Sequence, residues 1–370
     1  MSVNHYINLK KITFILLIIL ITCAFPEIES KNFNYNTSII IGPYPQKIEL
    51  NSSIIVWETN IATTYNSVQY GLNENCELIV YNNYSCNFHI VKLYGLNSST
   101  KYYYKVKSDN LESKVYSFYT KFEKEDTIKF VAYGDSRGVW DNWVNASKVA
   151  DGIEIAEPYF VLHTGDLVKN GNYFEQWIDF FRISDFIHNS TLYPTLGNHE
   201  YYNESYFKFF LLLNKNPWYS FDNGPVHFVC LDSNIKNSLK LSQLLWIIKD
   251  LKENTNLFTI VFFHHPPYSS GNHGSTIYLR IIWGRIFEYF NVDIVFNGHD
   301  HSYERGKVKS VNYIVTGGGG APLYDIGNKW WTIYSEKSYH YCLISCDNNN
   351  LSCKAIDTNG TVIDSFEIKK

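Results

Sequence analysis

The sequence predicts a multi-domain chain of the α+β/β class, in which a β-sandwich precedes a domain of alternating strands and helices. Short β-branched or alternating runs, separated by turn residues, fill residues 38–121, as in small all-β domains. From Ile128 onward, apolar runs typical of strands buried on both faces alternate with amphipathic helical segments. The length of 370 residues exceeds the usual size of one hydrophobic core, which favours two domains.

Residues 1–30 have the composition of a signal peptide. Lys10 and Lys11 precede an apolar stretch from Ile12 to Ala24, which Pro26 ends. This stretch is shorter than the roughly 20 residues that a membrane-spanning helix needs. We therefore expect a secreted protein, or one in the lumen of the secretory pathway, without a stable membrane span. An uncleaved N-terminal anchor is the alternative.

Cysteine usage fits an exported protein, because secreted proteins often form disulfides. The cysteines that follow the apolar stretch are even in number: Cys76, Cys86, Cys230, Cys342, Cys346 and Cys353. Proximity in the sequence favours the pairs Cys76–Cys86 and Cys346–Cys353, each of which flanks an Asn-rich turn. Free thiols are the alternative.

Glycosylation signals and charge also bear on the class of protein. Nine Asn-x-Ser/Thr triplets suit a glycoprotein, and they begin at Asn36, Asn51, Asn83, Asn97, Asn145, Asn189, Asn203, Asn350 and Asn359. The net charge is −4, and no block of Lys or Arg stands out. We therefore expect no nucleic-acid partner.

The expected sandwich occupies residues 38–121, with strands predicted at 54–57, 67–70, 89–93, 102–106 and 115–119. The segment Leu96–Val106 resembles the strand of fibronectin type III domains that carries a tyrosine corner. In this resemblance, Tyr102 is the corner tyrosine and Trp57 is the buried core tryptophan. Residues 122–127 are largely charged and predict a polar connector.

The second domain is expected over residues 128–370. The apolar runs at 128–133, 159–164, 257–263 and 292–296 predict strands. Apolar residues at helical spacing predict helices over Leu241–Leu251 and Leu279–Phe290. After Tyr313 the pattern returns to strands, with turns at 348–350 and 359–360.

Five polar motifs each follow an apolar run. They are GDSRG (134–138), GDLV (165–168), GNHE (197–200), HH (264–265) and GHDH (298–301). Because ligands gather beyond the carboxyl ends of strands in α/β sheets, we expect these loops to meet at one edge of the sheet. Asp, Asn and His are the ligand types that a pair of divalent metals takes. Two adjacent metals most often serve the hydrolysis of phosphate esters.

This combination resembles the calcineurin-like metallophosphoesterases and, within them, most closely the purple acid phosphatases, which also place a fibronectin-like domain first. The resemblance covers about Ser38 to the C-terminus. It rests on GNHE, Val261–His264, Gly298–Arg305 and the glycine-rich stretch Tyr313–Pro322. It implies a four-layer α/β/β/α metallophosphoesterase sandwich over residues 128–370. For the glycine-rich stretch, we expect a close-packed turn beneath the site.

The resemblance also implies a site for two metal ions, with Fe, Zn or Mn as the candidates. Asp135 and His301 are expected at the first metal, Asp166 between both metals, and Asn198, His264 and His299 at the second. Asn198 would also face the substrate. His199 is expected to be catalytic without ligating, because the matching family histidine faces the substrate and could protonate the leaving oxygen.

The chain departs from the family pattern at two positions. Purple acid phosphatases carry an iron-ligating Tyr three residues after the bridging Asp, where this chain has Lys169; an ammonium group is a poor ligand. Arg137 stands in the first motif, where it is expected to clamp a phosphate oxygen or to pair with a neighbouring carboxylate. His265 is expected either to line the substrate pocket or to pack beside Pro266.

The expected function is hydrolysis of phosphate monoesters by direct attack of a metal-bound hydroxide. The expected substrate is a phosphorylated small molecule or a phosphoprotein. A phosphodiesterase or nucleotide pyrophosphatase with the same metal core is an alternative, since substrate choice would depend on loops such as Gly171–Phe174 and Tyr268–Thr276. A non-enzymatic secreted binding protein is the second alternative.

Overall fold

The computed structural model describes residues 36–212 and 216–370. The predicted signal peptide lies outside the described residues. Residues Thr37–Lys370 form one compact unit. Among the helices of the described part, none is long and apolar enough to cross a membrane.

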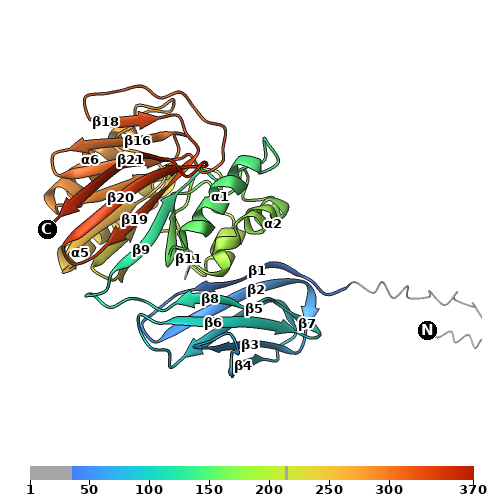
Figure 1. The fold of residues 1–370 in the computed structure, drawn as a ribbon. Helices are drawn as coiled ribbons and strands as arrows, with labels where there is room; N and C mark the ends of the chain where they lie inside the picture. The colour runs from blue at the N-terminus through green and yellow to red at the C-terminus, as the bar shows by residue number, and fades with distance from the viewer. Residues whose placement is uncertain (1–35, 213–215) are drawn as a thin grey trace, which may run out of the picture. The chain divides into compact units, whose positions relative to one another are not determined.

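The first part of this unit is a β-sandwich of two antiparallel sheets (Figure 1). One sheet has the order β1-β2-β5, formed by β1 (Ile39–Gln46), β2 (Ser52–Thr63) and β5 (Cys86–Tyr94). The other has the order β4-β3-β6-β7, formed by β4 (Leu78–Asn82), β3 (Asn66–Gly71), β6 (Lys101–Ser108) and β7 (Leu111–Glu112), and β8 (Tyr116–Tyr119) also pairs with β6.

The core of the sandwich contains the two aromatic residues that the sequence singled out. Trp57 is fully buried, and its Nε1 donates to Ser108 Oγ at 2.9 Å. The hydroxyl of Tyr102 accepts a hydrogen bond from the backbone N–H of Asn97 at 3.0 Å. This bond ties the strand to the turn that precedes it, as a tyrosine corner does. The relation to fibronectin type III domains stays a prediction.

Two mixed sheets make up the rest of the chain (Figure 1). The six-stranded sheet has the order β11-β10-β9-β19-β20-β21, and its strands are β9 (Ile128–Tyr133), β10 (Phe160–His163), β11 (Thr191–Pro194), β19 (His340–Cys346), β20 (Asn350–Asp357) and β21 (Val362–Lys369). The seven-stranded sheet has the order β12-β13-β14-β15-β17-β16-β18, and its strands are β12 (Tyr219–Asn223), β13 (Val226–Cys230), β14 (Phe258–Phe262), β15 (Ile294–Asn297), β16 (Tyr303–Val308), β17 (Val311–Thr316) and β18 (Thr332–Glu336).

The two sheets face each other across an apolar core and carry helices on their outer faces. Residues of both sheets, such as Phe130, Phe160 and Phe228, pack edge to face in one buried cluster. Helices α1 (Val144–Ala156) and α2 (Phe174–Ile183) pack against the six-stranded sheet. Helices α5 (Leu241–Glu253) and α6 (Ile277–Tyr289) pack against the other. The expected α/β/β/α layering is therefore present, with short helices η1 (Asp185–His188), α3 (Glu204–Phe209) and α4 (Ile235–Ser238) in the connections.

The predicted disulfide pairs are wrong, because all six cysteines of the described residues carry free thiols. The register of β19 and β20 gives the reason for one pair. Cys346 lies opposite Leu351, and Cys353 lies opposite Ile344, so the two residues are diagonal neighbours rather than partners. In the other predicted pair, Cys86 instead contacts the His89 ring, at 3.4 Å.

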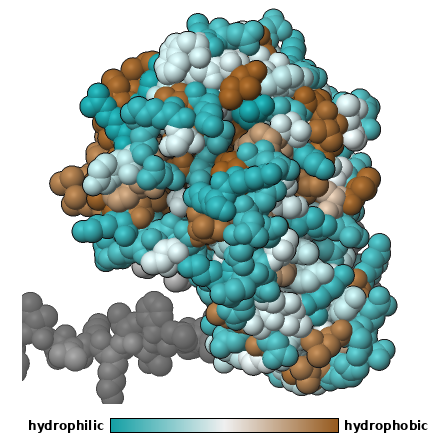
Figure 2. Space-filling model, turned by 60° about the vertical axis from the view of Figure 1, so that its left-hand side comes forward, coloured by the Kyte–Doolittle hydropathy of each residue, from teal (hydrophilic) through white to brown (hydrophobic). Residues whose placement is uncertain are grey.

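The surface gives partial support to the predicted glycosylation. Figure 2 shows a face on which hydrophilic side chains predominate and hydrophobic ones lie in small separate groups. Asn51, Asn83, Asn97 and Asn359 are exposed. Asn189 is half-buried, and its side-chain oxygen accepts a hydrogen bond from Ser117 N at 2.9 Å, so this position is less accessible. Glycosylation itself stays a prediction.

Candidate metal centre

The six predicted ligands come together at the carboxyl ends of parallel strands. Asp135, Asp166 and Asn198 follow β9, β10 and β11 of the six-stranded sheet. His264 and the pair His299 and His301 follow β14 and β15 of the seven-stranded sheet. The expectation of a single sheet edge was therefore wrong. Because the sheets face each other, their strand ends meet, and two sheets share the site.

The two aspartates are held in the same way. Both follow a glycine, and both have a φ of 59°. One oxygen of each accepts a backbone hydrogen bond from a neighbouring loop: Asp166 Oδ1 from His199 N at 3.0 Å, and Asp135 Oδ2 from His299 N at 2.9 Å. The other oxygen of each, Asp166 Oδ2 and Asp135 Oδ1, is buried without a hydrogen-bond partner.

Glycines next to the ligands leave room for these carboxylates. A Cβ on Gly197 would lie 2.2 Å from Asp166 Oδ1, and a Cβ on Gly298 would lie 2.3 Å from Asp135 Oδ2. No side chain tolerates such a contact without displacing the carboxylate. The glycines of the motifs are therefore required by the close approach of backbone and ligand.

Glu200, the last residue of GNHE, is a positioning residue that the sequence analysis did not identify. It is fully buried, and its carboxylate accepts from the backbone N–H of Leu167 and Gly197, each at 2.7 Å, and of Asp166 at 3.2 Å. Burial raises the pKa of Glu200, as does the charge of Asp166, while the backbone donors lower it. Its place in the motif was the only sequence signal. It joins the loop after β10 to the loop after β11.

The second metal position has the contacts of a cation site. His264 donates from Nδ1 to Thr164 O at 2.9 Å, so in the neutral ring Nε2 carries a lone pair. This Nε2 faces Asn198 Oδ1 at 3.1 Å and Asp166 Oδ2 at 3.5 Å. His264 Nε2 and Asn198 Oδ1 are both acceptor atoms, and acceptors that face each other in this way fit a shared metal ion.

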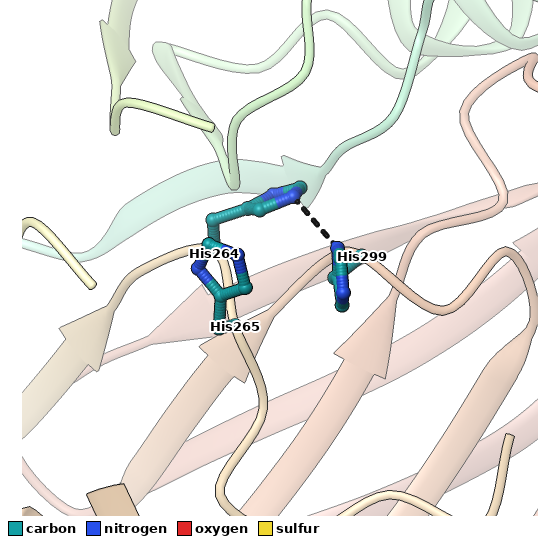
Figure 3. A group of neighbouring side chains, drawn as sticks. All are labelled: His264, His265 and His299. Carbon is teal, nitrogen blue, oxygen red and sulfur yellow. Dashed lines mark hydrogen bonds between the residues drawn. The ribbon is translucent and has the colours of Figure 1, made fainter. Parts of the chain in front are cut away.

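His299 completes this position. Its Nδ1 lies 3.2 Å from His264 Nε2, and Figure 3 shows the two side chains pointing toward each other from separate loops. Two donors about 2.0–2.1 Å from one tetrahedral zinc are about 3.3 Å apart. Ligand atoms of Asp135, Asp166 and His264 also lie within 4.8 Å of one another. The donor set therefore fits a divalent metal held by Asp166, Asn198, His264 and His299.

The histidines at this position are neutral at physiological pH. Burial lowers the pKa of His264, and burial together with the neighbouring His265 lowers the pKa of His299 to about 3. Metal binding requires the neutral imidazole. The burial that the fold imposes therefore keeps these ligands in their binding form without competition from protons.

The first metal position differs, because it contains a cationic side chain. His301 donates from Nδ1 to Pro322 O at 2.7 Å, which leaves Nε2 as an acceptor 3.5 Å from Asp135 Oδ1. The guanidinium of Arg137 donates to this Nε2 at 2.8 Å. The Nε of Arg137 also lies 3.4 Å from Asp166 Oδ2. The residues at this position fit a metal ion only after Arg137 moves away.

His199 and His265 flank the centre. His199 donates from Nδ1 to Lys169 O at 2.6 Å, and its Nε2 accepts a short hydrogen bond from Arg137. His265 packs against His299, with ring centroids 4.6 Å apart, and its Nδ1 lies 2.9 Å from Ser233 Oγ. Both predicted residues therefore lie beside the ligands.

His273 and the residue that positions it were not predicted from the sequence. The exposed His273 ring stacks on His299 with centroids 4.3 Å apart. Asp300 accepts from the backbone N–H of His273 at 2.7 Å and from Ser269 Oγ at 2.5 Å. The signal that could have identified Asp300 is its place inside GHDH.

The glycine-rich stretch packs beneath the site, as predicted. The backbone N–H of Gly319 donates to Gly134 O, and that of Ala321 donates to Asp135 O, each at 2.9 Å. A Cβ on Gly319 would lie 2.2 Å from Gly134 O. The stretch therefore supports the loop that carries Asp135 from below.

Comparison with known families agrees with this site. Residues 128–303 match the model of the calcineurin-like phosphoesterases. The chain therefore contains a calcineurin-like phosphoesterase domain, and the purple acid phosphatases are among its relatives, as the motifs predicted.

Three plant relatives illustrate the similarity. A phosphoenolpyruvate phosphatase of Allium cepa is 26% identical over 79% of this chain and 65% of its own length. A purple acid phosphatase of Glycine max is 28% identical over 66% of this chain and 58% of its own length. The Fe(3+)-Zn(2+) purple acid phosphatase 12 of Arabidopsis thaliana is 26% identical over 75% of this chain and 67% of its own length. The chain thus spans about two thirds or less of these relatives.

Solved structures show the same fold. The purple acid phosphatase from yellow lupin seeds superposes with a TM-score of 0.72 at 20% identity, over 88% of this chain and 74% of that one. PhoD gives a TM-score of 0.69 at 12% identity, over 90% of each chain. GAP50, the anchor in the inner membrane complex of Plasmodium, gives a TM-score of 0.55 at 18% identity, over 66% of this chain and 89% of that one.

Proposed function

We propose that the chain is a secreted, metal-dependent phosphatase that hydrolyses phosphate monoesters. We assign residues 38–121 to a fibronectin type III-like domain and residues 128–370 to the phosphoesterase domain. The observation that carries the proposal is the second metal position, where His264 Nε2 faces Asn198 Oδ1 at 3.1 Å and Asp166 Oδ2 at 3.5 Å. The family match over residues 128–303 supports it.

Each residue of the centre has its own proposed role in binding or hydrolysis. A divalent ion, when bound, lowers the pKa of a water molecule and polarises a phosphoryl oxygen. Asp166, Asn198, His264 and His299 hold that ion. Arg137, 5% exposed in the site, is placed to pair with a phosphoryl oxygen through its free N–H groups. His199 faces the same space with Nε2; when Arg137 turns to the phosphate, this nitrogen is free to take up a proton and pass it to the leaving oxygen.

His265 is proposed to contact the substrate. Ser233 Oγ accepts from the backbone N–H of His265 at 2.9 Å, and its own O–H is then free to donate to Nδ1 of the same residue. In that arrangement Nε2 carries the proton. This supports a hydrogen-bond donor to a phosphate oxygen rather than a metal ligand.

Substitution of two ligands tests the function. Asp166→Ala and His264→Ala should each reduce hydrolysis of p-nitrophenyl phosphate to less than about a tenth of the wild-type rate, because each removes a ligand that no neighbour replaces. Asp179→Ala, which removes only an exposed pair with Arg182, is the control. Folding is checked by circular dichroism. A folded His264→Ala protein with near wild-type activity would contradict the proposal.

A parallel assay separates monoesterase from diesterase activity. The loop at Gly171 is tied to the centre through a hydrogen bond from its N–H to His199 O at 2.9 Å, so loop structure and substrate choice are connected. We expect faster hydrolysis of p-nitrophenyl phosphate than of bis(p-nitrophenyl) phosphate. The reverse order would favour a phosphodiesterase or nucleotide pyrophosphatase.

A non-enzymatic binding protein is the second candidate. The hydrogen bonds from Arg137 to His301 and His199 favour it, because they engage two residues that a binuclear phosphatase needs free. A folded wild-type protein that retains a metal ion but hydrolyses neither ester would support this candidate.

A further inference from the structure

We propose that the guanidinium of Arg137 takes the place of the first metal ion, so that this chain binds a single ion tightly, at the second position. The inference rests on the metal-binding part of the proposed function and not on the catalytic part. It differs from the expected role of Arg137 as a substrate clamp beside two metals.

The contacts of Arg137 place its charge among the ligands of the first position. One terminal N–H group donates to His301 Nε2 at 2.8 Å, and the other donates to His199 Nε2. The Nε atom lies 3.4 Å from Asp166 Oδ2. Its charge also acts on Asp135, where burial raises the pKa of the carboxyl and Arg137 helps to lower it.

The two histidines that Arg137 contacts are each held in one ring orientation by a hydrogen bond from Nδ1. Each donates from Nδ1 to a backbone carbonyl, His301 to Pro322 O at 2.7 Å and His199 to Lys169 O at 2.6 Å. Because Nδ1 of each ring is a donor, Nε2 is the ring nitrogen that is left to accept. Arg137 uses both lone pairs, so a metal ion at His301 must first displace it.

The surroundings hold Arg137 in this place. Its side chain is 6% exposed, and its guanidinium lies 5.4 Å from the centre of the Trp140 ring, within cation–π range. Its positive charge therefore neutralises the buried carboxylates, as a metal ion would.

Lys169 adds a second cationic side chain near the first position. Its ammonium lies 4.7 Å from the centre of the Trp140 ring, which also faces the guanidinium of Arg137. Guanidinium and ammonium groups have no lone pair to offer a metal ion. Two cations beside this position therefore oppose a second divalent ion.

Metal stoichiometry tests the inference without reference to activity. The full-length secreted protein is stripped with a chelator and titrated with Mn²⁺ alone by isothermal calorimetry. We expect one tight ion per wild-type chain, and the electron paramagnetic resonance spectrum of an isolated Mn²⁺. In Arg137→Ala, the first position should bind a second ion about 10- to 100-fold more tightly than in the wild type, and the spectrum should become that of a coupled pair.

Three further variants make the outcome decisive. Arg182→Ala removes a surface arginine whose side chain is 59% exposed and should leave one tight ion. Asp135→Asn should also retain that ion, whereas His264→Ala should lose it. Two equally tight ions in the wild type, with no effect of Arg137→Ala, would overturn the inference while leaving the proposed function intact. The absence of any tight ion would instead contradict the metal site on which both proposals rest.

Discussion

The loops after β9 and β10 carry the two aspartates of the centre and differ in the side chain two positions after each aspartate. In both loops a glycine precedes the aspartate, φ is 59°, and one carboxylate oxygen is held by a backbone N–H while the other has no partner. Two positions after Asp166 the chain turns Val168 into the apolar core. After Asp135 it turns Arg137 into the site. The same backbone thus delivers two equivalent ligands to unequal environments.

This difference separates the features that the fold determines from those that single residues determine. The strand ends and the glycines position the carboxylates, and they do so equally for both. A residue two positions further along decides whether a guanidinium reaches the ligands of the centre. Similarity of fold, as seen with the yellow lupin purple acid phosphatase, therefore does not by itself give the number of metal ions.

The largest expected effect compares the two aspartates directly. Asp166→Asn should lower phosphatase activity by roughly 10³-fold, because it weakens the ion that supplies the nucleophile. Asp135→Asn should cost at least tenfold less, since Arg137 already engages His301, the other ligand of the first position. Steady-state rates with p-nitrophenyl phosphate, normalised to metal content, check this. Equal losses in the two variants would remove the distinction between the loops.

The glycines allow a finer comparison of the same two positions. An alanine at Gly197 would press on Asp166 Oδ1, and one at Gly298 on Asp135 Oδ2. We expect Gly197→Ala to weaken binding of the tight ion by about 10- to 100-fold. Gly298→Ala should leave that affinity nearly unchanged if it folds. Calorimetric titration with Mn²⁺ measures both, and thermal unfolding shows whether each variant is intact.

Glu200 tests whether the loops are held together as the hydrogen bonds indicate. Glu200→Ala leaves the buried N–H groups of Leu167 and Gly197 without their acceptor. Leaving buried donors unsatisfied should cost roughly 2–3 kcal/mol of stability. Denaturant unfolding provides the measurement. A loss below about 0.5 kcal/mol would mean that water replaces the carboxylate without penalty.

The smallest effect contrasts the neutral histidines of the centre with His227, which lies between Asp222 at 2.6 Å and Asp250 at 2.9 Å. Burial lowers the pKa of His227, but hydrogen bonds to both carboxylates outweigh burial and raise the pKa to about 9. A raised pKa stabilises the fold fully below the unfolded value of about 6.5, and this contribution is lost as pH rises through about 9.

The expected size of this contribution is about 1–2 kcal/mol, because Asp222 is more than half exposed and solvent screens the pair. Unfolding free energies measured between pH 6 and 10 should fall over that range in the wild type. The fall should be smaller in His227→Gln. Identical pH profiles for the two proteins would show that His227 is not charged.

Much of the site could be predicted because its residues are local. Apart from Asn198, each ligand lies shortly after a strand rich in apolar residues, such as the run Val261–Phe263 before His264, and parallel strands bring such residues together. The helices at 241–253 and 277–289 were equally visible from their apolar spacing. The division of the ligands between two sheets could not be seen, because strand order depends on contacts far apart in the sequence.

Other features depend on tertiary contacts that no short pattern records. β19 inserts beside β9 although nearly the whole domain separates them in the sequence. The contacts of Arg137 with His301 arise from the meeting of two sheets, so its position in the first motif suggested only a cation near the site. The cysteine pairs failed for the same reason, since register and not proximity decides which residues face each other.

Because Gly319 donates to Gly134 and Ala321 donates to Asp135, the centre can be completed only late in the synthesis of the chain. The stretch that closes the site from below is translated well after the loop it supports, and beyond the residues that match the family model. A nascent chain that has emerged only through β16 contains every predicted ligand but lacks the glycine-rich stretch that supports the loop of Asp135. The positions of Asp135 and Arg137 in the centre therefore depend on the C-terminal part of the chain having docked.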